Sequence, residues 1–134
     1  MRALGKNKTP CQRKERQIQF HFEQLTVWQE AMELVAEIYR VTQTFPKEER
    51  FGLTDQLRRA ALSIPANIAE GKGRYHPKEF VQFLYVARGS LYETITLIKT
   101  AGRLRYLETK DLDRLLNLCQ SISSKLSGLI KSLK

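Results

Sequence analysis

Apolar residues recur at steps of three and four in four separate stretches of this chain, and that spacing constrains the fold more than any other feature. Such a period places the apolar side chains of each stretch on one face of an α-helix. It predicts helices over about residues 26–44, 53–71 and 77–105, and a fourth from Thr109 to the C-terminal end. Only residues 18–22 alternate apolar and polar side chains as a strand does.

The connections between the four stretches are short, which makes consecutive helices antiparallel neighbours. A chain of 134 residues has the size of one domain. We therefore expect an all-α fold, an up-down-up-down antiparallel four-helix bundle formed by residues 23–134. Residues 1–22 are basic, rich in glutamine and interrupted by Gly5 and Pro10, and they are predicted to form a basic N-terminal arm.

The predicted helix ends carry their own signals. Thr26 and Thr109 are typical N-caps, whose side chains accept hydrogen bonds from the first turn. Gly71 and Gly73 are expected to close the second helix in the left-handed backbone region. Pro65 lies inside that helix, where the loss of one backbone hydrogen bond predicts a kink rather than a break.

Some apolar stripes are wider than one bundle needs. The first and third helices carry extra apolar residues beside their main faces, namely Met32, Tyr39, Val81, Tyr85, Val86, Tyr92 and Leu97. Four short helices cannot bury all of this surface against one another. Self-association would cover the remainder, so we expect a homo-oligomer.

The net charge is +9, and it is concentrated at the two ends of the sequence. Residues 1–24 carry six bases and two acids, residues 25–98 carry nine of each, and residues 99–134 carry eight bases and three acids. Such an excess attracts polyanions, of which nucleic acid is the commonest in a cytoplasm. The alternative is that the charge serves only to keep the protein soluble.

The exposed bases are the candidate contacts to RNA or DNA phosphates. They are Arg13, Lys14, Arg16, Arg58, Lys72, Arg74, Arg103, Arg105, Lys110, Lys125 and Lys131. Phosphate contacts carry little sequence preference. Tyr75 and Tyr106 lie near such bases and are candidates for stacking on unpaired bases, but we favour for each the role of a packing residue with a solvated hydroxyl.

The cysteines and the hydropathy favour a cytoplasmic protein without a membrane partner. Cys11 and Cys119 are too few and too far apart for a disulfide framework or a structural zinc site. No stretch approaches the ~18–20 apolar residues of a membrane-spanning helix, and the basic N-terminal segment lacks the apolar core of a secretory signal. Cys119 falls on an apolar stripe, so we expect it to be an inert core thiol.

The sequence offers no catalytic constellation, and we expect no enzyme, no metal and no cofactor. His21 and His76 have no partner at metal-ligand spacing. The run from Gly71 to Arg74 resembles a phosphate loop, but it follows a helix rather than a strand. Ser63 and Ser90 have no histidine nearby that would activate them.

Polar residues also interrupt the apolar faces of the second and third helices. We expect a structural polar network here rather than a binding site, because buried polar groups need partners. Its members are Ser63, Asn67, Glu70, Arg88, Ser90 and Glu93, with Arg88 paired to Glu70 or Glu93.

Two runs in this region resemble a known family. They are FPKEERFGLTDQLRRAALSIPANIAEGKGR (45–74) and EFVQFLYVARGSLYET (79–94), preceded by LTVWQEAMELVAEIY (25–39). They are similar to the bacterial four-helix-bundle proteins of the 23S ribosomal RNA intervening-sequence protein family, also called the S23 family. The likeness spans about residues 25–107; the fourth helix matches only as a generic amphipathic helix, and the arm is not part of the pattern.

The resemblance implies an all-α bundle that assembles into a homopentamer and has no catalytic residues. Members are encoded within ribosomal RNA genes, and related proteins are accessory variability determinants of diversity-generating retroelements, which bind nucleic acid and a reverse transcriptase. Three hypotheses therefore stand: a nucleic-acid-binding oligomer, an adaptor for a reverse transcriptase and its template RNA, or a structural bundle that binds neither. The sequence does not distinguish RNA from DNA.

Overall fold

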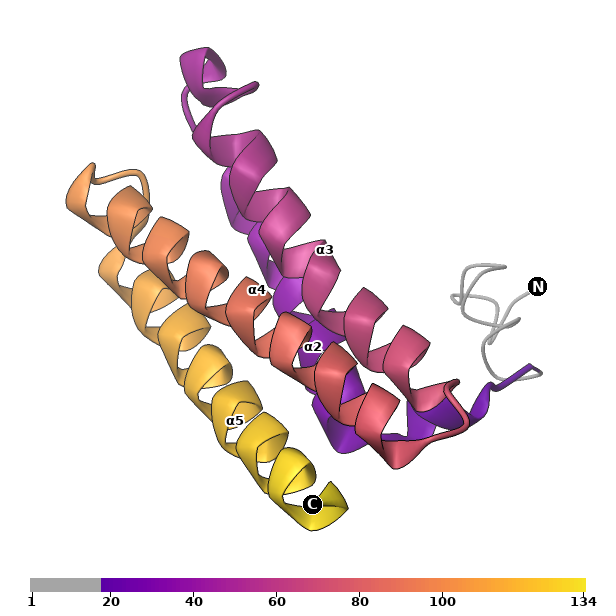
Figure 1. The fold of residues 1–134 in the computed structure, drawn as a ribbon. Coiled ribbons are helices and arrows are strands. Elements are labelled where there is room, and N and C mark those ends of the chain that lie inside the picture. Colours follow the sequence, from indigo (N-terminus) through magenta and orange to yellow (C-terminus); the bar gives the residue numbers. More distant parts are fainter. Residues whose placement is uncertain (1–17) are drawn as a thin grey trace, which may run out of the picture.

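The computed structural model describes residues 18–134, which form an all-α bundle (Figure 1). Most of the predicted arm, with Arg13, Lys14 and Arg16, lies outside these residues. The long helices are α2 (Thr26–Thr42), α3 (Leu53–Lys72), α4 (Pro77–Arg103) and α5 (Thr109–Leu133). Each helix packs against the next one along the chain, and α5 packs back on α2, as the predicted four-helix bundle requires.

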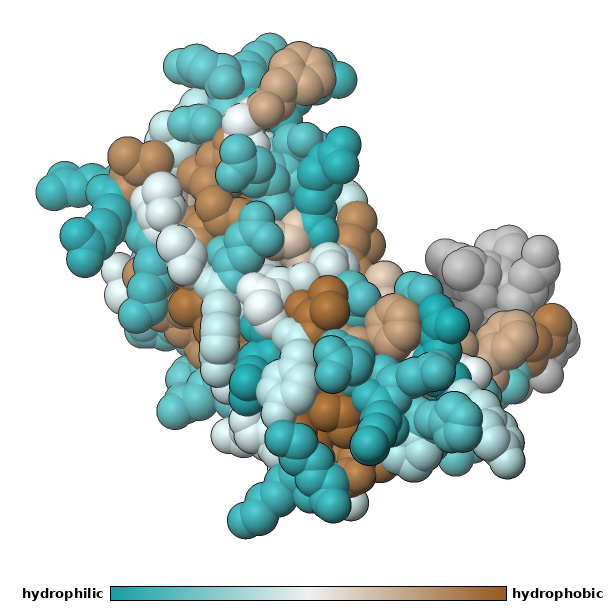
Figure 2. All heavy atoms as spheres, in the orientation of Figure 1, coloured by the Kyte–Doolittle hydropathy of each residue, from teal (hydrophilic) through white to brown (hydrophobic). Residues whose placement is uncertain are grey.

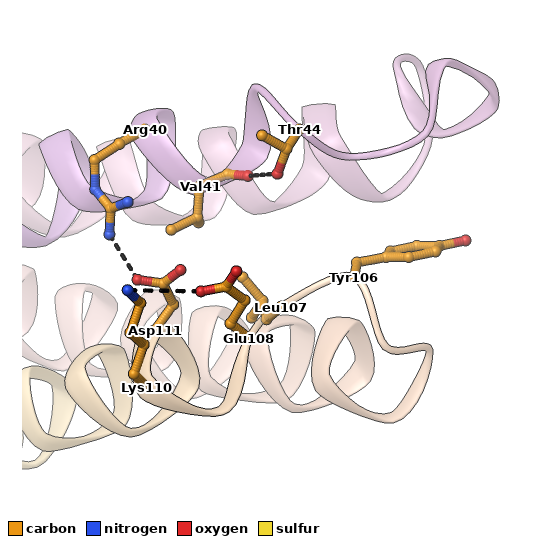
Figure 3. A pocket seen from close by; sticks show the side chains of 8 residues that line it. All are labelled: Arg40, Val41, Thr44, Tyr106, Leu107, Glu108, Lys110 and Asp111. Carbon is orange, nitrogen blue, oxygen red and sulfur yellow. Dashed lines mark hydrogen bonds and ion pairs between the residues drawn. The ribbon is translucent and has the colours of Figure 1, made fainter.

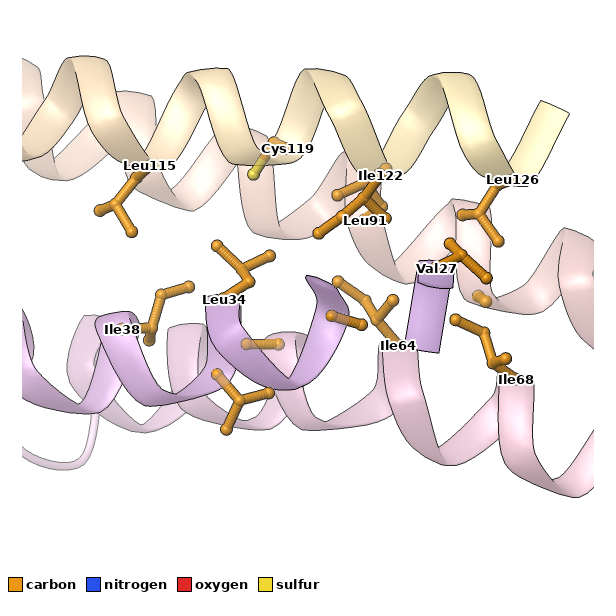
Figure 4. Packing of buried hydrophobic residues seen from close by; sticks show 14 of the residues in the cluster. Val27, Leu34, Ile38, Ile64, Ile68, Leu91, Leu115, Cys119, Ile122 and Leu126 are labelled. Atoms are coloured by element: carbon orange, nitrogen blue, oxygen red, sulfur yellow. The ribbon is translucent and has the colours of Figure 1, made fainter. Parts of the chain in front are cut away.

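The core runs through the centre of the bundle and draws on all four helices (Figure 4). Its largest fully buried apolar residues recur at helical spacing along each of the four helices, as the predicted period of three and four requires: Leu34, Ile38, Leu57, Ile64, Ile68, Leu84, Leu91, Ile98, Leu115, Ile122 and Leu126. Cys119 lies among them with 1% of its surface exposed. Burial raises the pKa of its thiol to about 12, so the thiol stays protonated and inert, as predicted.

The expected N-caps are wrong by one residue. Thr26 and Thr109 are the first helical residues, and the N-caps are Leu25 and Glu108, neither of which makes a side-chain cap hydrogen bond. A capping residue needs extended backbone, and it is Leu25 and Glu108 that have it, with ψ values of 122° and 151°. Helix α3 continues through Pro65 without a break.

The left-handed conformation expected at Gly71 and Gly73 is also wrong. Among the described residues no glycine has a positive φ, and Gly73 ends α3 at φ −77°. Gly71 is instead buried inside the last turn of α3, where a Cβ atom would lie 2.6 Å from Cβ of Phe83 and 2.9 Å from Cδ1 of Phe80. A glycine is therefore needed here for the close approach of α4, not for backbone freedom.

The segment before α2 is extended only in part, at Phe20, and not through residue 22 as its alternating pattern suggests. His21–Gln24 form a short 3-10 helix, η2, which spans the predicted boundary between arm and bundle. The ring of Phe22 packs edge-on against Trp28 at 5.4 Å between centroids, and the Glu23 carboxylate accepts a hydrogen bond from the Phe20 amide at 3.0 Å. An extended segment with no strand beside it leaves its backbone N–H and C=O groups without hydrogen-bond partners within the protein. The local contacts of the short helix provide partners for some of these groups.

Candidate nucleic-acid interface

Ion pairs occupy the seam between α2 and α5. Arg40 donates to Glu37 and to Asp111 across the seam, both at 2.9 Å, and Arg114 reaches the same Glu37 oxygen at 2.9 Å. The hydrogen bond from Arg40 is the main reason that the pKa values of Glu37 and Asp111 lie below their usual range. Figure 3 shows a hollow of about 250 Å³ that Arg40 and Asp111 border. These cations are already neutralised and offer little to a phosphate.

Three of the predicted phosphate contacts also have carboxylate partners. Lys125 lies 2.9 Å from Glu30, Arg74 lies 3.1 Å from Glu70, and Lys110 lies 3.8 Å from Glu108. Burial opposes ionisation of Glu30, but hydrogen bonds from Lys125 and Ser121 outweigh it and lower its pKa. A phosphate on any of these cations would have to compete with the carboxylate.

Two further predicted contacts pack against rings of the protein itself. The Arg58 guanidinium lies 4.4 Å from the centroid of Tyr39 and donates to Oγ1 of Thr42 at 2.8 Å. The Lys72 ammonium lies 5.8 Å from the ring centroid of Phe80. These contacts of Arg58 connect α3 to α2, and they indicate a role in the fold rather than in phosphate binding.

The outer surface of the α4–α5 pair is different. Six cations on it make no ion pair with any described residue: Lys78, Arg88, Lys99, Arg103, Lys131 and Lys134. We call this surface the α4–α5 face. Figure 2 shows much of it, with hydrophilic side chains alternating with apolar patches over the two helices. Arg103 and Lys131 are predicted contacts, and so is Arg105, which is exposed in the turn that follows Arg103.

Three shallow hollows follow the seam between α4 and α5, with volumes of about 530, 290 and 310 Å³. Their floors are apolar, formed for example by Val81, Ile95 and Leu116. Their rims carry lysines, an arginine, glutamines and a serine, and within the described part of the chain no carboxylate side chain lines any of the three. Glu93 and Asp113 are exposed elsewhere on the same helices. The seam itself is therefore a positively charged groove with an apolar bottom.

Two tyrosines stand on the α4 side of this groove. Tyr85 accepts a hydrogen bond on its hydroxyl from Lys134 at 2.9 Å, and Arg88 lies 4.9 Å from its ring centroid. The bond from Lys134 is the main cause that lowers the pKa of Tyr85. Tyr92, two turns further along α4, is half exposed.

Lys78, Lys99 and Lys134 are absent from the predicted contacts, and Arg88 is predicted only as a network member. A signal for them is nevertheless present in the sequence. Tyr85, Arg88, Tyr92, Lys99 and Arg103 follow one another at steps of three, four, seven and four. These steps place aromatic and basic side chains on one helix face, which is typical of surfaces that bind nucleic acid.

The two tyrosines predicted as stacking candidates lie away from the groove. Tyr106 packs on Phe45 with 5.4 Å between ring centroids and donates from its hydroxyl to Oε2 of Glu49 at 3.0 Å. That hydrogen bond raises the pKa of Tyr106, and the ring belongs to the packing between two turns. Tyr75 is 92% exposed in the α3–α4 turn, and its ring makes an edge contact with His76 at 4.9 Å between centroids.

The polar network between α3 and α4 exists in a smaller form. Ser90 donates to the Ser63 hydroxyl at 2.8 Å, and the Asn67 amide donates to the carbonyl and the hydroxyl of Ser63 at 2.8 and 3.0 Å. The predicted pairing of Arg88 with Glu70 or Glu93 is wrong. Arg88 is two residues from Ser90, about 200° around the helix, and so it faces Tyr85 and α5 instead of α3. Glu93 is exposed, and Glu70 pairs with Arg74.

Residues 18–134 contain neither a candidate metal site nor a candidate membrane-spanning helix. No group of three or more His, Cys, Asp or Glu side chains in this part of the chain is placed to hold a metal ion. Within the same residues, no helix is long and apolar enough to cross a membrane.

Comparison with known proteins gives one family and one fold. A family model described as 23S rRNA-intervening sequence protein matches residues 23–128, which extends the likeness into α5. A solved structure of a protein with unknown function from the S23 ribosomal protein family of Bacteroides thetaiotaomicron superposes with a TM-score of 0.73. It is 23% identical, over 79% of this chain and 99% of that one, and at that identity it supports the fold alone. No curated protein matches the chain.

Proposed function

This chain belongs to the 23S rRNA-intervening sequence protein family, and on that premise we propose that it is a non-enzymatic, homo-oligomeric cytoplasmic protein that binds nucleic acid through its α4–α5 face. The observation that carries the proposal is the set of six cations along this face that have no carboxylate partner among residues 18–134. A cation without a carboxylate partner binds a phosphate without first giving up an ion pair, and it releases the counterions condensed on the nucleic acid.

The spacing of these cations suits an extended polyanion. Lys78 and Arg103 lie near opposite ends of α4, so the face runs about 38 Å at ~1.5 Å per residue. Lys99 borders two adjoining hollows and bridges them. A phosphate backbone laid along the groove would meet a cation on every few turns of helix, with little preference for base sequence.

Exposed apolar residues on the other side of the bundle support the oligomer. Met32 and Tyr39 are seven residues apart on one face of α2, and both are exposed. Leu62 is 44% exposed one turn after Arg58, which contacts Tyr39, so it continues this surface on α3. Burying this strip against a second copy leaves the α4–α5 face free. We propose the pentamer that the resemblance implies, in which the charge of +9 per chain becomes roughly +45 and binding gains avidity.

Leu62→Glu should dissociate this oligomer. A carboxylate on the strip would lose its solvation in the assembly but keeps it in the single chain. Light scattering should show the mass falling from about five times to one times the 15.6 kDa of the chain, with an unchanged helical spectrum. Ser124→Glu is the matched control, since it adds the same charge to the exposed face of α5. An unchanged mass for Leu62→Glu would refute the assignment of this strip.

Neutralising two cations of the groove should weaken nucleic-acid binding. We expect Lys99→Gln with Arg103→Gln to reduce affinity about 10- to 100-fold at low salt and to lower the salt slope by about two. The control is Lys47→Gln with Arg50→Gln, which removes one lysine and one arginine from the α2–α3 turn; neither of these has an ion-pair partner among the described residues. Fluorescence anisotropy with labelled RNA measures both. Equal losses for the two pairs would mean that total charge, not this face, determines binding.

The resemblance also supports an alternative, in which the same basic oligomer acts as an accessory variability determinant beside a reverse transcriptase and its template RNA. A pull-down with a reverse transcriptase encoded next to the gene separates the two. Retention of the enzyme after nuclease treatment would favour the alternative, whereas retention only through RNA would favour simple nucleic-acid binding.

A further inference from the structure

Tyr92 presents an uncovered aromatic ring in the middle of the α4–α5 face. It is 52% exposed, one turn after Arg88 and two turns before Lys99, at steps of four and seven that put all three on one side of α4. Among the described residues its hydroxyl has no side-chain hydrogen bond and its ring has no aromatic or cationic neighbour. Covering an exposed ring of this size removes apolar surface from water and so stabilises the complex with any partner that covers it.

Two other tyrosines, Tyr85 and Tyr39, already have a cation over the ring. Arg88 and Lys134 both lie over the ring of Tyr85, at 4.9 and 5.4 Å from its centroid. Arg58 lies over Tyr39 in the same way. Tyr92 differs from them, because Arg88 and Lys99 lie one turn before it and two turns after it on α4, but no cation of residues 18–134 lies over its ring.

The surroundings of Tyr92 fit a nucleobase and its phosphates. The hollow of about 290 Å³ begins at Ile95, one turn along α4, and its rim carries Lys99, Gln120 and Ser123. A base stacked on Tyr92 would place its neighbour over the apolar floor of this hollow. The flanking phosphates would then lie near Arg88 and Lys99.

We propose that the nucleic acid bound on the α4–α5 face is single-stranded, with one base stacked on Tyr92. The inference rests on the proposed function and adds the class of ligand. A duplex keeps its bases paired and stacked inside, so it presents phosphates but no free base face to a ring on a convex helix surface. A single strand presents both, and every base has a face that can stack, so sequence preference stays low.

The test uses the full chain and three probes of one sequence, about 16 nucleotides long: unstructured RNA, single-stranded DNA and the DNA duplex. We expect both single strands to bind more tightly than the duplex. Tyr92→Ala should lower the affinity for the single strands about 5- to 100-fold and change the affinity for the duplex little. Tyr92→Phe should retain the affinity because it keeps the ring. Tyr75→Ala is the matched control, since it removes a fully exposed tyrosine away from the groove.

The outcomes separate this inference from the proposed function. If Tyr92→Ala binds single strands as the parent does, or if it loses the same factor on the duplex, the stacking assignment is wrong. Binding that still depends on Lys99 and Arg103 would in that case leave the proposed function standing. If no probe binds at low salt, the proposed function fails and this inference fails with it.

Discussion

Leu91→Ala should lower the free energy of unfolding by about 2–5 kcal/mol. Leu91 has no exposed surface, and it lies in the centre of α4 within the cluster that joins all four helices (Figure 4). Removing its methyl groups loses their transfer free energy and leaves a cavity that a closed bundle cannot fill by collapse. Urea denaturation followed by circular dichroism, at one fixed protein concentration, measures the change.

Leu126→Ala should behave in the same way, because Leu126 is equally buried on α5. Leu104→Ala is the control, because Leu104 is exposed at the end of α4. This substitution should lower the free energy of unfolding by less than ~1 kcal/mol. Losses below ~1 kcal/mol at both Leu91 and Leu126 would show that the apolar stripes do not form the core described here.

Gly71→Ala should destabilise the protein by about 1–3 kcal/mol, although alanine is the better helix former. The new Cβ would lie 2.6 Å from Cβ of Phe83, which is fixed to the α4 backbone and cannot move aside by rotating a side chain. Helices α3 and α4 would have to separate, and their contact is the most extensive in the bundle.

Gly128→Ala makes the matched comparison in α5. A Cβ at Gly128 meets nothing within 4 Å, so only helix propensity changes and the protein should gain about 0.5–1 kcal/mol. The two glycine substitutions are therefore expected to have opposite signs in the same denaturation experiment. A gain at both positions would mean that α3 and α4 do not approach as closely as the structure has them.

The spacing of apolar residues predicts the fold because local sequence alone determines which residues share one helix face, and an apolar face has to be buried. Stripe positions such as Ile64, Leu91 and Ile122 are the buried ones, and the four helices end within two residues of the expected positions. Caps and glycines are less predictable. Gly71 has the sequence of a helix end, but its role is set by Phe83 on another helix, and no local rule contains that neighbour.

The candidate site is less predictable for the same reason. A basic residue binds a phosphate readily only if no carboxylate already pairs with it, and three of the seven ion pairs among residues 18–134 join distant parts of the chain. Lys125 pairs with Glu30 across 95 residues, whereas Lys99 has no such partner among the described residues. Total charge therefore indicates a polyanion ligand, but only the packing of α5 on α2 indicates which cations remain available.

The central claim is that this bundle binds nucleic acid through cations on an exposed face. The most direct test measures the affinity of the full chain for an unstructured RNA over a series of salt concentrations. We expect the logarithm of the binding constant to fall linearly with the logarithm of salt, by about 0.7 for each phosphate contacted, and to reach a slope of several. A binding constant that does not change with salt, or no binding at low ionic strength, would contradict the claim.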